Sequence, residues 1–316
     1  MFPIARFFKR IGTRSNEIYI FEWYLLGDLI MALDAIFSIR KNFPDKRIVL
    51  FIDHNWMALQ NNLDFLDEVV GVKCPWSPSK KKKFFQALVV FLKLMKPYFK
   101  NGAYATFSFR GDLRDHFLQG LIPSQKKFGL AYTGFEYLLT NIYFNSFLKQ
   151  VDRNNGVLKS QGFFIYECPY FKKILGFTNK YIIGCFFARH SERNYPVSQA
   201  LELKKMLKKA GFTLMLIAPS KSANNFEDFI GFTFENFVSC LSNAAYFIGV
   251  DSGPSHLVAK FNIPSIILYL KGRKKHFLPK GKDIYGIESK SAHTISDIEP
   301  LMIYDLFIKK SNLQNV

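Results

Sequence analysis

The sequence lacks the short motifs that mark several common classes of enzyme. It contains no Gly-x-Gly-x-x-Gly fingerprint, no phosphate-binding P-loop and no His-Glu-x-x-His pair. These motifs carry dinucleotide, nucleoside triphosphate and zinc chemistry, so oxidoreductase, NTPase and zinc-protease functions have no support. An Asp-x-Asp pair, which could hold a metal against a diphosphate, is also missing. We therefore expect neither a metal nor a cofactor.

Cysteine is scarce, and the four residues are far apart. Cys74, Cys168, Cys185 and Cys240 form no Cys-x-x-Cys pair and have no histidine at a ligand spacing. This usage favours reduced thiols in a cytosolic protein. The first fifteen residues have neither the apolar core nor the small-residue cleavage site of a secretory signal, so export is not expected.

Long apolar runs are absent as well. The most apolar stretch, Phe84 to Phe99, is interrupted by Lys93, Lys96 and Pro97, which excludes a conventional membrane-spanning helix. We expect a cytoplasmic protein, either fully soluble or resting on the cytoplasmic face of the inner membrane. Lys80 to Lys83 lead into this stretch, and the cationic, aromatic segment could lie on an anionic leaflet with help from the basic N-terminal residues Phe7 to Arg10. A core-packing helix with a solvated basic flank is the alternative.

The chain is long, apolar and strongly basic. Its 316 residues, with 49% hydrophobic and 17% aromatic side chains, predict a folded protein of two domains. Its net charge of +18 indicates polyanionic partners, among them nucleic acids, anionic lipids and phosphorylated saccharides.

Strand and helix patterns alternate along the chain, which predicts α/β architecture with two doubly wound, Rossmann-like domains. The first domain is expected over residues 1–165 and the second over residues 166–316, because a polar stretch from Gln150 to Gly162 resembles a boundary loop. A helix over about residues 295–310 is expected to pack back toward the first domain. The other expected strands and helices are strands at Glu17–Leu26, Arg47–Ile52, Ala105–Phe109, Lys127–Leu130, Tyr181–Phe187, Thr213–Ala218, Tyr246–Val250 and Ser265–Leu270, with helices after Gly27-Asp28, at Ser198–Ala210, at Phe234–Leu241 and from Gly253 to near Phe261.

The most informative segment is FIGVDSGPSHLVAKFNIPSIILYL, Phe247 to Leu270. An apolar strand here leads through a polar turn into a helix, whose first N–H groups, at Ser252, Gly253 and Ser255, would favour an anion such as a diphosphate. The alternative is structural, with Asp251 capping the helix and His256 packed inside it.

This segment resembles the C-terminal signature of glycosyltransferase family 9, which contains the lipopolysaccharide heptosyltransferases. The matching positions are Asp251, Ser252, Gly253, His256 and Pro264. The resemblance implies the GT-B arrangement, in which two Rossmann-like domains face a cleft. It also implies that Asp251 holds hydroxyls of the donor sugar while Ser252, Gly253 and His256 line the nucleotide diphosphate.

The N-terminal segment YLLGDLIMALDAIFSIRKNFPDKRIVLFI resembles the opening βαβ unit of the same family. The resemblance gives Asp28 the role of general base, accepting a proton from the acceptor hydroxyl as that oxygen attacks the anomeric carbon, and places Gly27 at the acceptor. A helix cap is the alternative for Asp28 alone. Asp34 stands where the family commonly has proline.

Three further stretches align with the family less closely. Arg110, Arg114 and His116 in FSFRGDLRDHFL are candidates for contacts with acceptor phosphates, with a solvated charged turn as the equal alternative. Arg189 and Arg193 in ARHSERNYP are candidates for binding the leaving diphosphate. Leu270 to Gly272 replaces the usual Gly-x-Thr, and this departure touches the donor pocket.

Together these features predict an inverting, metal-independent glycosyltransferase that moves heptose from ADP-heptose to a lipopolysaccharide core or a related lipid-linked saccharide. The same fold using a UDP- or GDP-sugar remains an alternative. A non-catalytic protein that binds nucleic acid or another polyanion is the alternative from a different class. The leading hypothesis involves no nucleic-acid partner.

Overall fold

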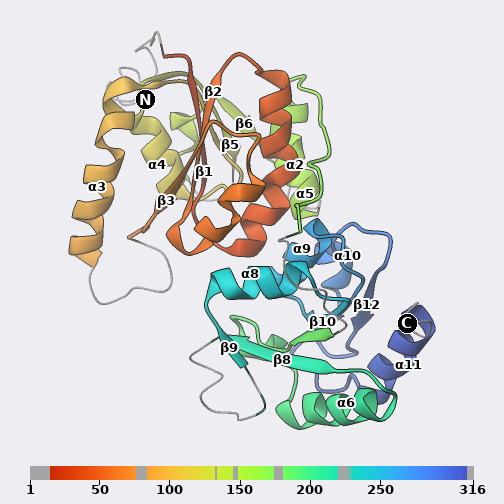
Figure 1. Ribbon diagram of the computed structural model, residues 1–316. Helices are drawn as coiled ribbons and strands as arrows, with labels where there is room; N and C mark the ends of the chain where they lie inside the picture. Colours follow the sequence, from red (N-terminus) through yellow and green to blue (C-terminus); the bar gives the residue numbers. More distant parts are fainter. Residues whose placement is uncertain are drawn as a thin grey trace. The chain divides into compact units, whose positions relative to one another are not determined.

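A computed structural model describes residues 15–75, 84–131, 134–144, 149–173, 181–219, 228 and 230–311. The chain divides into two compact units, Met1–Cys168 and Pro169–Val316, whereas the sequence placed the division between residues 165 and 166. Each unit contains one parallel sheet with helices on both faces (Figure 1). The predicted pair of Rossmann-like domains is therefore confirmed.

The first unit is built on a six-stranded sheet in the order β3-β2-β1-β4-β5-β6. Helices α2 and α5 cover one face, and α3 and α4 cover the other (Figure 1). The elements are β1 (Glu17–Glu22), α2 (Leu26–Asn42), β2 (Arg47–Asp53), η1 (His54–Asn62), β3 (Glu68–Val72), α3 (Phe84–Asn101), β4 (Ala103–Ser108), α4 (Leu113–Leu121), β5 (Ser124–Leu130), η2 (Glu136–Leu138), β6 (Asn141–Tyr143) and α5 (Gln150–Lys159).

The second unit repeats this plan with the order β12-β11-β10-β7-β8-β9. Numbered from its own first strand, this sheet has the same order as the first, 3-2-1-4-5-6, which is the order of dinucleotide-binding folds. The elements are β7 (Ile182–Cys185), η3 (Ser191–Arg193), α6 (Val197–Lys209), β8 (Leu214–Pro219), β9 (Ile230–Phe232), α8 (Phe234–Ser242), β10 (Tyr246–Val250), α9 (Gly253–Lys260), β11 (Ser265–Tyr269), α10 (Lys274–Phe277), β12 (Ile284–Glu288) and α11 (Pro300–Lys310).

The central strands form because nearly continuous apolar runs are buried on both faces of each sheet. Residues Ile18 to Phe21 of β1 and Ile48 to Ile52 of β2 have no exposed surface. In both sheets the strand order reverses between two central neighbours, β1 and β4 in the first unit and β10 and β7 in the second. In parallel sheets of this kind, ligands bind outside the carboxyl ends of the strands at the reversal.

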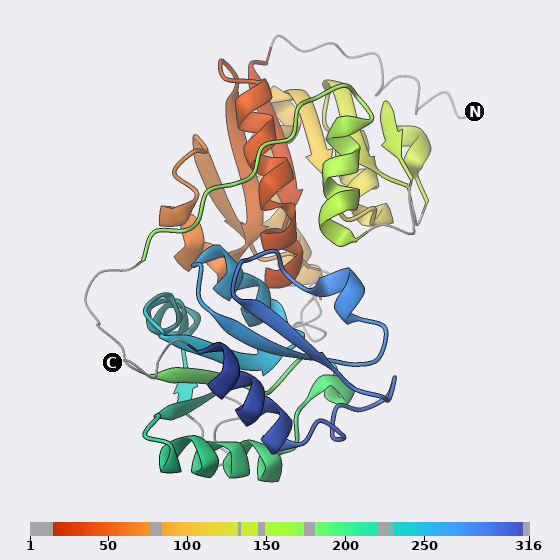
Figure 2. The ribbon, with the colours of Figure 1, turned by 90° about the vertical axis from the view of Figure 1, so that its right-hand side faces the viewer.

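Helix α2 holds the last residues of the first unit along one of its faces. Figure 2 shows this segment, in green, running beside the red helix. Side chains at intervals of four residues on α2 make the contacts, since positions i and i+4 share a helix face. Asp34 Oδ1 accepts from the Cys168 amide (3.1 Å), Ser38 Oγ from the Tyr166 amide (2.8 Å), and Asn42 Oδ1 from the Phe164 amide (3.2 Å). Asp34 thus has a structural role.

One expectation about the chain between the two units is wrong. The polar stretch predicted as a boundary loop forms α5, which packs on α2, and Asn154 donates from Nδ2 to the Met31 carbonyl at 3.0 Å. This tertiary packing overrides the weak helix propensity of the local sequence. The C-terminal helix α11 buries Ile303 and Phe307 in the core of the second unit. The ring centroids of Phe307 and Tyr246 are 5.0 Å apart.

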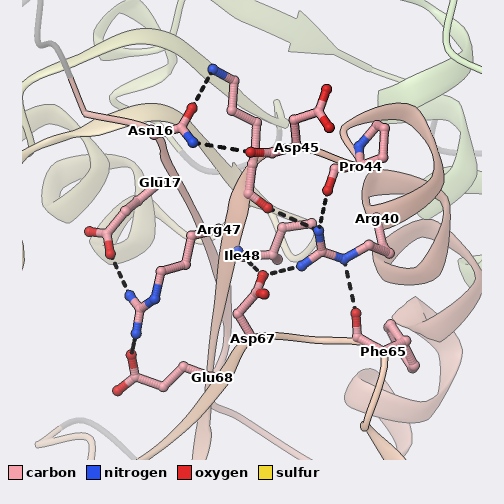
Figure 3. Close-up of polar contacts among 11 residues, drawn as sticks. Asn16, Glu17, Arg40, Pro44, Asp45, Arg47, Ile48, Phe65, Asp67 and Glu68 are labelled. Atoms are coloured by element: carbon pink, nitrogen blue, oxygen red, sulfur yellow. Dashed lines mark hydrogen bonds and ion pairs between the residues drawn. The ribbon is translucent and has the colours of Figure 1, made fainter.

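Two arginines join the chain segments at the N-terminal edge of the first sheet (Figure 3). Arg40 donates to the carbonyls of Phe65 (2.9 Å), Pro44 (3.1 Å) and Lys46 (2.9 Å) and pairs with Asp67. Arg47 bridges Glu17 and Glu68, which lie at the starts of the two neighbouring strands. This edge is opposite the carboxyl ends of the strands, so we assign the network to stability.

None of the helices in the described part of the chain is both long enough and apolar enough to cross a membrane. The Lys80–Lys83 run and the N-terminal residues Phe7, Phe8, Lys9 and Arg10 lie outside the described residues.

Candidate functional site

Asp28 and Arg110 meet at the strand reversal of the first sheet. Asp28 is in the first turn of α2, the helix that follows β1, and Arg110 follows β4. Arg110 Nη1 lies 3.3 Å from Asp28 Oδ2, and the two side chains are 32% and 28% exposed. The N-cap position of α2 is Leu25, which makes no side-chain cap bond, so Asp28 is not the cap. A carboxylate that is open to solvent at this position can accept a proton from a bound hydroxyl.

The ring of Tyr24 packs against the guanidinium group of Arg110. The guanidinium carbon of Arg110 lies 3.7 Å from the centroid of the Tyr24 ring, a cation–π arrangement. The Tyr24 hydroxyl donates to Oδ1 of the fully buried Asp115 at 2.9 Å, and Trp23 Nε1 donates to the same oxygen at 3.0 Å. Ser108 Oγ donates to Asp115 Oδ2 at 3.2 Å. Burial and the charge of Asp112 raise the pKa of Asp115 to about 7, against these three hydrogen bonds, which lower it.

Glu22 adds a second buried carboxyl beside this group. It ends β1, is 2% exposed, and its Oε2 has no hydrogen-bond partner among the described residues. Burial, followed by the nearby charges of Asp28 and Asp115, holds the pKa of Glu22 well above its usual range. Glu22, Tyr24 and Asp115 were not predicted, because the first two lie in the expected apolar strand and the third lies in the expected charged turn.

The remaining acceptor candidates have different environments. Gly27 lies in the first turn of α2, beside Asp28. Arg114 binds its neighbour Asp112, with Nε 2.7 Å from Oδ1 and Nη2 2.5 Å from Oδ2, and is 39% exposed. His116 has no exposed surface, and its Nδ1 lies 2.8 Å from the Gly134 carbonyl. Because His116 is on the buried side of α4, the prediction that it contacts an acceptor phosphate is wrong.

Asp251 and two arginines meet at the strand reversal of the second sheet. Asp251 follows β10 and its side chain is 3% exposed. Arg193, which follows β7, donates from Nη1 to the Asp251 carbonyl at 2.9 Å and lies 3.6 Å from its Oδ2. Arg273, which follows β11, donates from Nε to the same Oδ2 at 2.6 Å. Two positive charges against one negative charge leave this group cationic, which suits an anion.

Arg273 was missed by the sequence analysis. Its segment differs from the family pattern, and Gly272 before it has a φ of +79°, which favours glycine. The signal that could have found it is topological. The strand before Arg273 pairs with the strand before Asp251, so both residues emerge side by side at one edge of the sheet.

The amides in the turn before α9 were expected to be available to an anion, but the turn itself provides hydrogen-bond partners for some of them. Ser252 is the N-cap, and its amide donates to Ser255 Oγ at 3.3 Å, while the Ser255 amide donates to the Ser252 carbonyl at 3.1 Å. Two of the three predicted anion-binding amides therefore have partners within the turn. Gly253 is the first residue of the helix, where the helix dipole still favours negative charge.

His256 and Arg189 complete the predicted donor residues. His256 is 6% exposed on α9, and burial lowers its pKa to about 4, so its imidazole is neutral at neutral pH. Arg189 is exposed in the loop after β7. The structure thus brings Arg193, Asp251 and the start of α9 together, while Arg189 lies on the surface of the same loop.

No group of three or more His, Cys, Asp or Glu side chains within the described ranges has an arrangement that could hold a metal ion.

Comparisons with known proteins show a partial match to one family. Residues 159–297 match the family model of glycosyltransferase family 9 (heptosyltransferase). No curated protein sequence matches the chain significantly.

Three solved structures have similar folds at low sequence identity. The heptosyltransferase WaaC of E. coli with ADP is 16% identical and has a TM-score of 0.73. The alignment covers 93% of this chain and 99% of the WaaC chain. The ADP-heptose LPS heptosyltransferase II of E. coli is 14% identical with a TM-score of 0.77, covering 95% and 100%. A family 9 glycosyltransferase of Veillonella parvula is 14% identical with a TM-score of 0.77, covering 96% and 98%. The match to the family 9 model over residues 159–297, together with this fold over nearly the whole chain, identifies the protein as a glycosyltransferase.

Proposed function

We propose that the protein transfers heptose from ADP-heptose to a hydroxyl of a lipopolysaccharide core or related lipid-linked saccharide, with inversion and without a metal. One observation carries the proposal. The strand reversal of the first unit presents a solvent-accessible carboxylate beside an arginine, and that of the second unit presents two arginines at a helix N-terminus. These are the two sets of groups that a proton-abstracting, diphosphate-releasing transfer requires.

On the acceptor side, Asp28 takes the proton of the attacking hydroxyl. Attack by that oxygen on the anomeric carbon breaks the bond to the diphosphate oxygen, so the configuration at that carbon inverts. Arg110 lies beside Asp28 and is half-exposed, which suits a contact with an acceptor phosphate. Arg114, in the first turn of α4, is a second candidate, whereas the buried His116 is no longer included.

On the donor side, Arg193 and Arg273 stabilise the charge that develops on the leaving diphosphate. Asp251 is almost fully buried and engaged by both guanidinium groups, so we assign it the orientation of these arginines in addition to the contact with sugar hydroxyls that the family resemblance implies. The N-terminus of α9, with Ser252 and Gly253, contributes its dipole, and neutral His256 can supply one hydrogen bond.

ADP-heptose is favoured as donor because the E. coli heptosyltransferase II that shares this fold is named for it, and because WaaC was solved with ADP. A panel of ADP, UDP and GDP in thermal-shift measurements tests this choice, since a ligand that binds the folded state raises the midpoint, and at equal concentration a tighter ligand raises it further. If only UDP or only GDP stabilised the protein, the donor would be the corresponding UDP- or GDP-sugar. No nucleotide effect together with steeply salt-dependent RNA binding would favour the non-catalytic alternative.

The base is tested with Asp28→Asn. We expect turnover to fall by about two to four orders of magnitude while ADP binding is retained, because general-base catalysis contributes that much. Asp45→Asn, an exposed carboxylate just beyond the other end of α2, is the matched control and should keep full turnover. Ordinary turnover in Asp28→Asn would show that another group is the base.

A further inference from the structure

Helix α3 of the first unit has an exposed apolar face. Phe85 is 79% exposed, Val89 52%, Val90 58% and Leu92 44%. Figure 1 shows α3 as the outermost helix on its side of the first sheet. Such a concentration of large apolar side chains at the surface, on a single helix, is unusual for an element that only packs against its own sheet.

The opposite face of α3 already forms the core. Phe91 and Met95 are 1% and 0% exposed, and Leu94, Tyr98 and Phe99 pack against the same cluster. At about 100° per residue, the exposed positions of α3 occupy a separate arc of about 160° on the other side. The exposed apolar residues are therefore additional to those that fold the helix onto the sheet.

Positive charge shares the exposed arc with these apolar side chains. Lys93, Lys96 and Lys100 are exposed on it, and the sequence of α3, FFQALVVFLKLMKPYFKN, contains no acidic residue. A lysine on such a face can keep its ammonium in water while its methylene stem rests on apolar surroundings. The exposed face of α3 thus carries both apolar side chains, which can enter an apolar medium, and positive charges, which attract anions.

The presence of both apolar and lysine side chains on this face indicates which class of partner it binds. The core of a protein interface is depleted of lysine, and single-stranded nucleic acid is bound by aromatic rings on which bases stack, a role that valine and leucine do not serve. Apolar side chains bordered by lysines on one face of a helix are typical of helices that lie in the interface of an anionic bilayer.

We propose that the exposed face of α3, formed by Phe85, Val89, Val90, Leu92, Lys93, Lys96 and Lys100, docks on the surface of an anionic lipid bilayer. Its biological purpose rests on the proposed function, since a lipid-linked acceptor lies at such a surface. The binding itself does not depend on sugar transfer and can be measured without it.

The test is co-sedimentation of the full chain with vesicles of phosphatidylcholine, with and without phosphatidylglycerol. We expect binding to the phosphatidylglycerol vesicles only, weakened by salt. The Lys93→Gln/Lys96→Gln/Lys100→Gln variant should bind about a hundredfold more weakly, because each lysine near the surface contributes about fivefold. Lys205→Gln/Lys208→Gln/Lys209→Gln on α6 changes the charge equally and should bind as the parent does.

The apolar part is tested by Phe85→Ser/Leu92→Ser, with Leu301→Ser/Met302→Ser on the exposed side of α11 as the control. We expect only the α3 variant to lose binding, by about tenfold or more. The proposal is overturned if either α3 variant binds like its control. Sedimentation without vesicles gives a second test. The proposal is also overturned if the parent is a dimer and Phe85→Ser/Leu92→Ser is a monomer, since the face would then join two copies of the chain. Thermal stabilisation by ADP is measured in every variant, so a failure of the donor assignment is recognised separately.

Discussion

Arg273 Nε lies 2.6 Å from Oδ2 of Asp251, and Arg193 Nη1 reaches the same buried oxygen at 3.6 Å. Three loops, each following a different strand of the second sheet, thereby converge on one carboxylate. The arginines are held in place by this shared partner, so the cationic group is formed before any diphosphate binds. Such preorganisation avoids the cost of ordering two long side chains during the reaction.

The role of Arg273 can be tested with Arg273→Ala. We expect ADP to bind about 10 to 100 times more weakly, because a charge-assisted hydrogen bond to phosphate is lost. Arg273→Lys should recover only part of the affinity, since lysine lacks the planar fork of the guanidinium group. Lys275→Ala removes the same charge from an exposed neighbour and serves as the control in calorimetric titrations with ADP. Equal losses in Arg273→Ala and Lys275→Ala would mean that only net charge matters.

Tyr24 is expected to position Arg110 through its ring and to anchor itself through its hydroxyl. Tyr24→Leu removes the ring below the guanidinium and should lower kcat/KM about 3- to 30-fold, the range of a cation–π contact. Tyr24→Phe keeps the ring and should stay within about threefold of the parent in kcat/KM. It loses the bond to Asp115, so its free energy of unfolding should fall by about 1–3 kcal/mol.

These Tyr24 variants are compared by steady-state kinetics, urea unfolding and ADP titration. ADP affinity should be unchanged in both, because the assigned donor residues belong to the second unit. Tyr24→Phe losing as much kcat/KM as Tyr24→Leu would assign the effect to the anchor on Asp115 and not to the ring.

The neutral state of His256 predicts a pH-dependent stability. Its folded pKa of about 4 lies below its ordinary value, so between about pH 4 and 6.5 the unfolded chain binds a proton that the folded chain does not. The free energy of unfolding should therefore fall as the pH falls through this window, by roughly 3 kcal/mol at its lower end, and this contribution is constant above pH 6.5.

His256→Gln should flatten the dependence in that window, as measured by urea unfolding from pH 4 to 7.5. His293→Gln, which replaces an exposed histidine of the same unit, is the control and should keep the slope of the parent. If His256→Gln has an unchanged slope, the imidazole is not held neutral in the folded protein.

The sequence was sufficient to predict two doubly wound sheets and eight of the twelve described strands, since buried apolar strands and the turns after them are encoded locally. Strand β10, Tyr246–Val250, has the predicted bounds and is followed directly by Asp251, whereas β1 ends at Glu22, four residues before the predicted end of that strand. The errors concern tertiary relationships. Helix α5 depends on packing against α2, the direction of His116 depends on which side of α4 is buried, and the Arg273–Asp251 pair joins residues 22 positions apart.

The Arg40–Asp67 pair provides a test of stability at the N-terminal edge of the first sheet. Burial alone would raise the pKa of Asp67, but the Ile48 amide and Arg40 together lower it below the ordinary value. For a carboxyl of this kind, the stabilisation is present above the unfolded pKa of about 4 and is lost as the pH falls through the lower folded value. Asp67→Asn keeps an oxygen that can accept from the Ile48 amide and removes only the charge.

We therefore expect Asp67→Asn to have a lower thermal midpoint than the parent at pH 7 and nearly the same midpoint at pH values below the folded pKa of Asp67. The effect at pH 7 should be small, because Asp67 is 42% exposed and solvent screens the pair. Asp45→Asn, whose exposed carboxylate points away from the network in Figure 3, is the control and should show no such convergence. A midpoint difference that persists unchanged in acid would mean that Asp67 acts through its shape and hydrogen bonds, since a carboxyl that has become neutral no longer attracts Arg40.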